Sequence, residues 1–145
     1  MPERETIERA QEDAREGKSP STQAGEFVRE EMHHIREGKH GAASTKQAIA
    51  IGLSKARRSG VKLPAKGSAS TREKAQQDTQ VSRSKRKPSA TRSRATTKAL
   101  KRERRSAASR SALSRQAKTT AKKRSASARS QSARKAANTR SRKAA

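Results

Sequence analysis

The feature that most restricts how this chain can fold is the unequal division of its charge. Residues 1–67 carry 13 Lys/Arg and 10 Asp/Glu, whereas residues 68–145 carry 25 Lys/Arg and only 3 Asp/Glu. Only 28% of all residues are hydrophobic, and Phe27 is the single aromatic residue. Low hydrophobicity with high net charge leaves little apolar burial to offset the entropy of ordering a chain. We therefore predict a small helical head over residues 1–67 and a basic tail over residues 68–145.

The head is predicted to contain two to three short helices. The first, over residues 3–16, has acidic residues in its first turn and ends before Gly17. The second, over residues 23–37, follows a cap at Ser21 or Thr22. Its apolar side chains recur near one face, which predicts a side that packs against a neighbour.

A third helix is indicated by Ser44 and Gln47, which have the spacing of a capping box, and by the stop at Gly60. With the second helix it forms a helical hairpin, on which Val61 and Leu63 are expected to fold back. A core of this size is marginal, so a partner or a second copy of the chain would help it.

The tail is rich in Ser, Thr, Ala, Lys and Arg and has no fixed period. Pro88 interrupts any helix near it, and residues 90–145 contain no Pro and no Gly. Alanine favours a helix, but repulsion between cations opposes one in free solution. The predicted fold class is therefore mainly α, with a helical head followed by a long disordered or conditionally helical tail.

The formal net charge of +25 indicates a polyanionic partner. Nucleic acid is favoured because each docked cation releases condensed counterions. A membrane surface is not expected, since the basic region offers only Leu100 and Leu113 as large apolar side chains. The longest apolar run, residues 48–51, is too short to span a bilayer. The N-terminal residues are charged and do not resemble a secretion signal.

The tail has about one cation every three residues, which in a helix corresponds to one every ~4 Å. Duplex DNA presents a phosphate charge every ~1.7 Å of its axis. Base readout needs a rigid element, and single-strand binders stack bases on aromatic side chains that the tail lacks. The tail therefore predicts sequence-independent and salt-dependent binding of duplex DNA.

The predicted phosphate contacts are the cations that follow the third helix and those of the tail. They are Arg57, Arg58, Lys62, Lys66, Arg83, Lys85, Arg86, Lys87, Arg92, Arg94, Lys98, Lys101, Arg102, Arg104, Arg105, Arg110, Arg115, Lys118, Lys122, Lys123, Arg124, Arg129, Arg134, Lys135, Arg140, Arg142 and Lys143. For the first four, an equally good interpretation is that they complement the dipole at the end of the third helix.

No metal site, cofactor or catalytic residue is predicted. Glu30 and His34 are four residues apart on one helical face, as metal ligands can be. However, the adjacent His33 and His34 would point about 100° apart on a helix, and His40 follows in the turn, where it would suit a phosphate. The chain has no cysteine, nucleophile elbow, Walker loop or zincin motif, so we do not expect an enzyme.

Two stretches of the head resemble a known domain. They are the segment Gly-Glu-Phe-Val-Arg-Glu-Glu-Met-His-His-Ile-Arg-Glu-Gly-Lys-His-Gly at residues 25–41 and the segment that begins Ser-Thr-Lys-Gln-Ala-Ile-Ala-Ile at residue 44. Residues 19–66 resemble a domain of unknown function in small basic bacterial proteins, some of them named plasmid stabilisation or DNA-binding protein. The resemblance implies a bacterial source and a short helical head. The tail is similar in composition to linker-histone tails and bacterial histone-like proteins.

The sequence thus predicts a non-enzymatic, histone-like DNA-binding protein of the bacterial cytoplasm, located on the nucleoid. Its head would provide self-association or contact with a protein partner. One alternative is an RNA-associated or ribosome-associated protein, because basic tails also bind folded RNA. Another is the interaction module of a plasmid stabilisation or partition system, with the tail as a general anchor.

Overall fold

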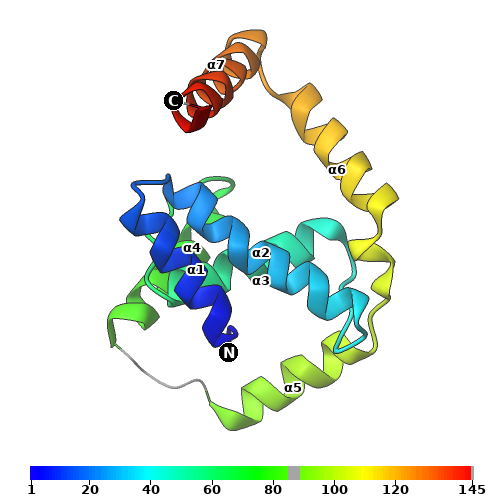
Figure 1. Ribbon diagram of the computed structural model, residues 1–145. Coiled ribbons are helices and arrows are strands. Elements are labelled where there is room, and N and C mark those ends of the chain that lie inside the picture. The colour runs from blue at the N-terminus through cyan, green and yellow to red at the C-terminus, as the bar shows by residue number, and fades with distance from the viewer. Residues whose placement is uncertain (85–88, 145) are drawn as a thin grey trace. The chain divides into compact units, whose positions relative to one another are not determined.

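The structure is a computed structural model and describes residues 1–84 and 89–144. Within these residues all regular structure is helical, and the chain divides into two compact units, Met1–Ser109 and Arg110–Ala145 (Figure 1). The first unit contains α1 (Arg4–Arg15), α2 (Pro20–Arg36), α3 (Thr45–Arg58), α4 (Ala69–Ser84), α5 (Ala90–Lys101) and the 3-10 turn η1 (Arg105–Ala108). The second contains α6 (Arg110–Lys123) and α7 (Ala126–Ala144).

The first unit is a helical bundle centred on α2, which contacts both α1 and α3 (Figure 1). The buried members of its main apolar cluster are Ala10, Ala24, Phe27 and Ala56, and the partly buried Ile7, Leu53, Val61 and Leu63 pack against them. The predicted return of Val61 and Leu63 onto the hairpin is confirmed. Because most of the buried residues are alanines, the helices must lie close together.

At Gly52 the α2 and α3 helices approach each other closely. A Cβ atom at this position would lie 2.7 Å from Val28 Cα and 2.9 Å from Val28 Cγ2. Optimal contacts between carbon atoms are about 3.5–4.0 Å, so any side chain here would force the two backbones apart. A small residue in the middle of α3 thus sets the spacing of the hairpin.

A serine stands immediately before every helix from α2 to α7. These serines are Ser19, Ser44, Ser68, Ser89, Ser109 and Ser125. The hydroxyl groups of Ser19, Ser44, Ser68 and Ser125 accept an N-cap hydrogen bond from the backbone N–H three residues later. Such a bond satisfies one of the free N–H groups in the first turn. The cap of α2 is Ser19, so this helix begins at Pro20 and not at the predicted residue 23.

The prediction of a long disordered or conditionally helical tail is wrong. The described residues after Gly67 form α4, α5, η1, α6 and α7. Repulsion between cations is outweighed by the good helix propensity of Ala, Lys and Arg, by serine caps and, in the first unit, by packing. The predicted interruption at Pro88 lies outside the described residues.

The α4 helix packs against α3 and buries two of its residues, Ala75 and Asp78. Asp78 is 5% exposed and accepts hydrogen bonds from Ser54 Oγ at 2.7 Å and from Arg58 Nε at 2.8 Å. A buried carboxylate is stable only when such donors surround it. One of the few acidic residues after Gly67 therefore attaches α4 to the hairpin.

A second attachment is made by residues 100–108, which lie along the loop between α2 and α3. The backbone N–H of Gly41 donates to Leu100 O at 2.9 Å, and that of Ala42 donates to Arg104 O at 3.1 Å. The approach is close, since a Cβ atom at Gly41 would lie only 2.0 Å from Glu103 O. The end of α5 is thus fixed to the bundle by backbone hydrogen bonds.

The η1 turn completes this attachment. Its Ala107 and Ala108 are buried, and their carbonyl groups accept hydrogen bonds from the bundle. Thr45 Oγ1 donates to Ala107 O at 2.7 Å, and Arg36 Nε donates to Ala108 O at 2.9 Å. Two small side chains allow both donors to reach the backbone of η1.

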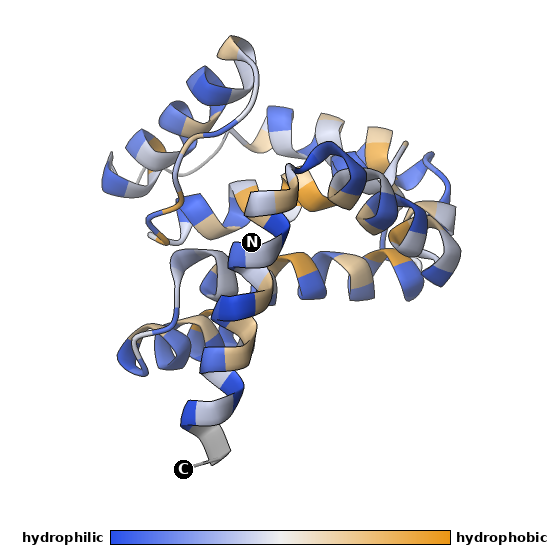
Figure 2. Cartoon of the chain, turned by 90° about the horizontal axis from the view of Figure 1, so that it is seen from above, coloured by the Kyte–Doolittle hydropathy of each residue, from blue (hydrophilic) through white to orange (hydrophobic). Residues whose placement is uncertain are grey.

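The second unit has no apolar core among its described residues. Between residues 110 and 142, where burial is described, no side chain is buried. Near the C-terminus the hydropathy colouring changes repeatedly between blue, white and light orange (Figure 2). At the corner between α6 and α7, Arg124 Nη2 donates to Ala128 O at 3.1 Å and Arg129 Nη1 donates to Arg124 O at 3.4 Å.

None of the described helices has the length and apolar character needed to cross a membrane.

Candidate nucleic-acid interface

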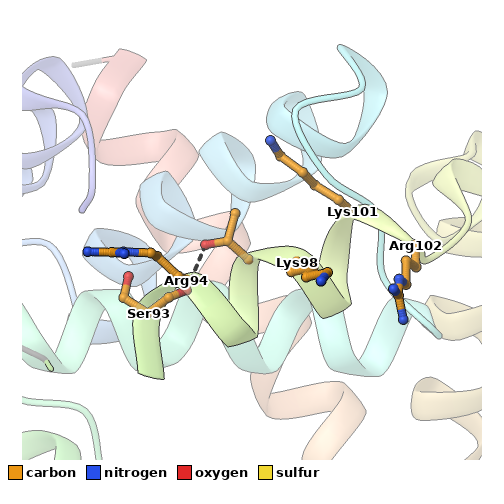
Figure 3. A pocket seen from close by; sticks show the side chains of 6 residues that line it. Ser93, Arg94, Lys98, Lys101 and Arg102 are labelled. Atoms are coloured by element: carbon orange, nitrogen blue, oxygen red, sulfur yellow. Dashed lines mark hydrogen bonds between the residues drawn. The ribbon is translucent and has the colours of Figure 1, made fainter. Parts of the chain in front are cut away.

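The α5 helix presents a row of cations along one side. Arg94, Lys98, Lys101 and Arg102 follow the spacing i, i+4, i+7, i+8, which places them on one face of a helix. Together with Ser93 and Thr97 they line a hollow of about 470 Å³ (Figure 3). All six lining residues come from α5 and the residue that follows it, so the hollow is part of the helix surface.

The chemistry of this hollow suits a chain of phosphates. Its four cations and two hydroxyl residues are exposed, and no acidic residue lines it. The Thr97 hydroxyl donates to the carbonyl of Ser93 at 2.9 Å, but each cationic side chain extends toward solvent (Figure 3). Because its walls come from one helix and the residue after it, the hollow is open and cannot enclose a small molecule, whereas its cations can contact an extended polyanion.

The second unit is the most strongly cationic part of the chain. Residues 110–145 contain 12 Lys/Arg and no Asp/Glu. In helices with a rise of about 1.5 Å per residue, this composition gives one cation every ~4.5 Å. No side chain between residues 110 and 142 is buried, so the cations of this range lie at the surface.

The four predicted contacts near the end of α3 have different environments. Arg58 is bound to the buried Asp78, which compensates much of its charge. Arg57 is partly buried, and its Nε has no hydrogen-bond partner within the described structure. Lys62 and Lys66 are exposed. The structure therefore leaves the two lysines better placed for phosphate than the two arginines.

The remaining predicted contacts are distributed along the later helices. Arg83 lies in α4, Arg92 joins the α5 cations, Arg104 and Arg105 lie at η1, and α6 carries Arg110, Arg115, Lys118, Lys122 and Lys123. The α7 helix carries Arg129, Arg134, Lys135, Arg140 and Arg142, with Arg124 at the corner before it. Lys85, Arg86 and Lys87 lie outside the described residues, as does the side chain of Lys143.

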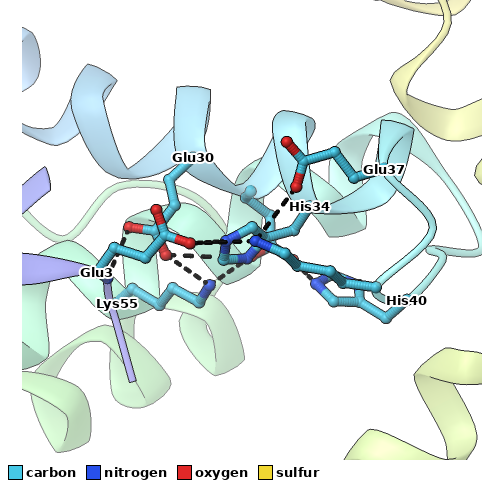
Figure 4. A network of polar contacts seen from close by, with 8 residues as sticks. Glu3, Glu30, His34, Glu37, His40 and Lys55 are labelled. Carbon is cyan, nitrogen blue, oxygen red and sulfur yellow. Dashed lines mark hydrogen bonds and ion pairs between the residues drawn. The ribbon is translucent and has the colours of Figure 1, made fainter.

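A second polar site, on the bundle, gathers buried carboxylates and histidines (Figure 4). The Glu31 side chain is fully buried and the Glu30 side chain is 2% exposed. Lys55 Nζ lies 2.7 Å from Glu31 Oε2 and 3.3 Å from Glu30 Oε1. One ammonium group thus lies between two buried carboxylates from adjacent positions of α2.

His34 and His40 face this pair of carboxylates. Their ring centroids are 6.1 Å apart in an edge-to-face arrangement. His34 Nε2 lies 2.8 Å from Glu3 Oε1, and His40 Nε2 lies 3.4 Å from Glu31 Oε1. In the sequence His33 is the neighbour of His34, but His33 is exposed and the loop instead brings His40 beside His34. No periodicity in the sequence could have indicated this contact, because it depends on the path of the loop.

Glu3 joins the N-terminus to this site. Hydrogen bonds from His34 and Lys39 hold the pKa of the Glu3 carboxyl below its ordinary value. In turn, Glu3 and Glu37 raise the pKa of Lys39. The backbone N–H of Glu3 also donates to Glu30 Oε2 at 3.2 Å. These contacts fix the outer side of the polar site.

Comparison with known proteins gives one family match. The profile of a family of unknown function, DUF6496, matches residues 15–67. This region is similar to that family and covers α2, α3 and the loop between them. Neither the curated proteins nor the solved structures include a match to the chain.

Proposed function

We propose that this protein binds duplex DNA without sequence preference and without catalysis, in a histone-like, nucleoid-associated role. The observation that carries the proposal is the second unit, whose 36 residues include 12 Lys/Arg and no Asp/Glu. The described part of these two helices has cations at the surface and no buried side chain, so it lacks the enclosed pocket that a small substrate would need. They are well suited to neutralise phosphates.

The α5 helix supports the same proposal independently. Its row of exposed cations is held by the bundle through the Gly41–Leu100 and Ala42–Arg104 backbone bonds. An ordered basic helix loses less conformational entropy when it binds than an unstructured chain does. The bundle would then act as a support that presents α5 to the phosphate backbone.

Sequence-independent binding follows from the side chains available. Specific base contacts come mostly from Arg, Lys, Asn and Gln held rigidly against base edges in a groove. The described cations of α6 and α7 are surrounded by Ser and Ala, without a buried side chain between residues 110 and 142 to orient them. Contacts to phosphate position a protein on DNA but carry no base information.

The test is a DNA-binding titration of the full chain over a series of salt concentrations. The variant replaces four exposed α6 cations with Gln: Arg115, Lys118, Lys122 and Lys123. The matched control replaces four exposed cations of the first unit with Gln: Arg15, Lys46, Arg72 and Lys74. Both variants lower the net charge by the same amount, so only the position of the removed charge differs.

The slope of log K against log salt is negative, and we expect it to become shallower by up to about 3.6 in the α6 variant. Each phosphate that a cation no longer neutralises removes ~0.9 from the magnitude of the slope. The control should change the slope by less than about 1. Equal changes in the two variants would mean that only total charge matters, and no change in either would remove the proposal. Competition with folded RNA in the same assay separates the alternative: strong preference for RNA would favour an RNA-associated protein.

A further inference from the structure

The polar site of the bundle has a feature that DNA binding does not explain. Glu31 is fully buried, yet neither of its carboxylate oxygens accepts a hydrogen bond within the described part of the chain. Lys55 lies close to Oε2 as an ion-pair partner, whereas Oε1 faces His40 Nε2. A buried carboxylate normally accepts several hydrogen bonds, so the Oε1 side lacks a donor or a cation.

The hydrogen bonds of His34 and His40 define which of their ring nitrogens face the buried carboxylates of Glu30 and Glu31. His40 Nδ1 lies 3.1 Å from Gly41 O, and a carbonyl oxygen can only accept, so Nδ1 carries a proton. His34 Nε2 lies 2.8 Å from the Glu3 carboxylate and is protonated for the same reason. In neutral rings the remaining nitrogens, His40 Nε2 and His34 Nδ1, then present lone pairs toward Glu31 and Glu30.

A ring-nitrogen lone pair that faces a carboxylate is unfavourable unless that nitrogen is protonated or a cation lies between the two groups. The buried shell of Glu30, Glu31 and Lys55 contains two negative charges and one positive charge, which leaves one negative charge uncompensated. A protonated histidine or a metal ion would supply the missing positive charge. In each ring one nitrogen is hydrogen-bonded to an oxygen, Gly41 O for His40 and the Glu3 carboxylate for His34. Histidines that bind a metal through one nitrogen usually donate their other N–H group to such an oxygen.

From this geometry we infer that Glu31, His34 and His40 bind a divalent transition-metal ion of the zinc class. One donor atom from each residue lies within 4.8 Å of the other two. Three donors at that spacing lie about 2.8 Å from their common centre, and zinc takes nitrogen and oxygen ligands at ~2.0–2.2 Å. The site therefore needs an inward movement of up to about 0.6–0.8 Å per side chain, which the loop position of His40 allows.

Such an ion would fix the loop between α2 and α3. His40 directly precedes Gly41 and Ala42, whose N–H groups hold the end of α5. Metal binding would join this loop to α2 and so stabilise the attachment of residues 100–108. The ion is thus assigned a structural role, and it does not depend on the proposed binding of DNA.

The test uses the full chain without a polyhistidine tag, stripped of metal by a chelator, with ZnCl₂ and CoCl₂ as probes. Calorimetric titration with zinc measures affinity and stoichiometry, and the visible absorption of bound cobalt reports nitrogen and oxygen ligation. The variants are His40→Asn in the loop and Glu31→Gln in α2. His33→Asn is the matched control, because His33 lies on α2, as Glu31 does, but its side chain is exposed.

We expect one zinc ion per chain, a rise in melting temperature with zinc, and affinity weakened by at least about tenfold in both site variants. His33→Asn should bind as the original chain does. If the original chain shows neither heat of binding nor a shift in melting temperature, the positive charge is a proton on a histidine and the inference is wrong. Equal weakening in the His33 and His40 variants would likewise contradict the assigned site. Should Glu31→Gln fail to fold, the loop variant still decides the result.

Discussion

The close contact at Gly52 permits a sharp test of the hairpin. In a Gly52→Ala variant the new Cβ would lie 2.7 Å from Val28 Cα, 2.9 Å from Val28 Cγ2 and 3.0 Å from Val28 N. The shortfall from an ordinary carbon contact is about 1 Å, and two of the three atoms belong to the backbone and cannot rotate away. Overpacking of this kind costs about 1–3 kcal/mol, and the better helix propensity of Ala returns about 1 kcal/mol. Because the closest atom belongs to the backbone of Val28, the cost lies in the upper part of that range, and we expect a net loss of stability of about 1–2 kcal/mol.

Gly25→Ala is the matched control, because this glycine lies in α2 and a Cβ there would meet nothing within 4 Å. Only the gain in helix propensity remains, so the control should be more stable by about 0.5–1 kcal/mol. The same chemical change is thus predicted to have opposite signs at two positions of one hairpin.

Hydrogen–deuterium exchange measured on peptides from α2 and α3 is the suitable assay, since the chain has no Trp or Tyr for fluorescence. A destabilisation of about 1–2 kcal/mol corresponds to exchange about 5–30 times faster when opening limits exchange. The Gly25 variant should exchange more slowly than the original chain. If Gly52→Ala were as protected as Gly25→Ala, the backbones of α2 and α3 would not be in contact and the reasoning would fail.

Three further substitutions test the attachments of the later helices. Asp78→Ala should destabilise α4 by about 1–3 kcal/mol, because its buried hydrogen bonds are removed, while Glu73→Ala on the exposed side of the same helix should have little effect on exchange in α4. Gly41→Ala should accelerate exchange in residues 100–108, since its Cβ would lie 2.0 Å from a backbone oxygen; unchanged protection there would show that the segment does not dock on this loop. Ser125→Ala should reduce the helicity of α7 in circular dichroism by removing about 1 kcal/mol of capping energy, and a spectrum identical to that of the original chain would argue against the cap.

Much of the helical hairpin could be predicted from the sequence. The capping pair Ser44 and Gln47 begins α3 as expected, and Val61 and Leu63 return to the core. These features depend on neighbours within a few residues of each other. Local hydrogen bonding and hydrophobic periodicity are sufficient to indicate them.

The prediction failed after Gly67 because it weighed total charge against helix propensity and did not consider caps and packing. The serines at 68, 89, 109 and 125 were a usable signal, since each directly precedes a helix. The role of Asp78 could not be inferred from the sequence. Its hydrogen-bond donors, Ser54 and Arg58, lie on α3, and they reach Asp78 only when α4 packs against α3. Charge counting assigned this residue to a solvated tail.

The sequence by itself determined the distribution of charge and the separation of an apolar hairpin from a cationic C-terminal region. These are sums over residues and do not depend on how the chain is arranged. Only the tertiary structure decided that Asp78 attaches α4, that the Gly41 loop holds the end of α5, and that His40 joins His34 and Glu31. The physical reason is that buried polar groups select their partners by position in space, and such contacts between distant residues leave no periodic trace in the sequence.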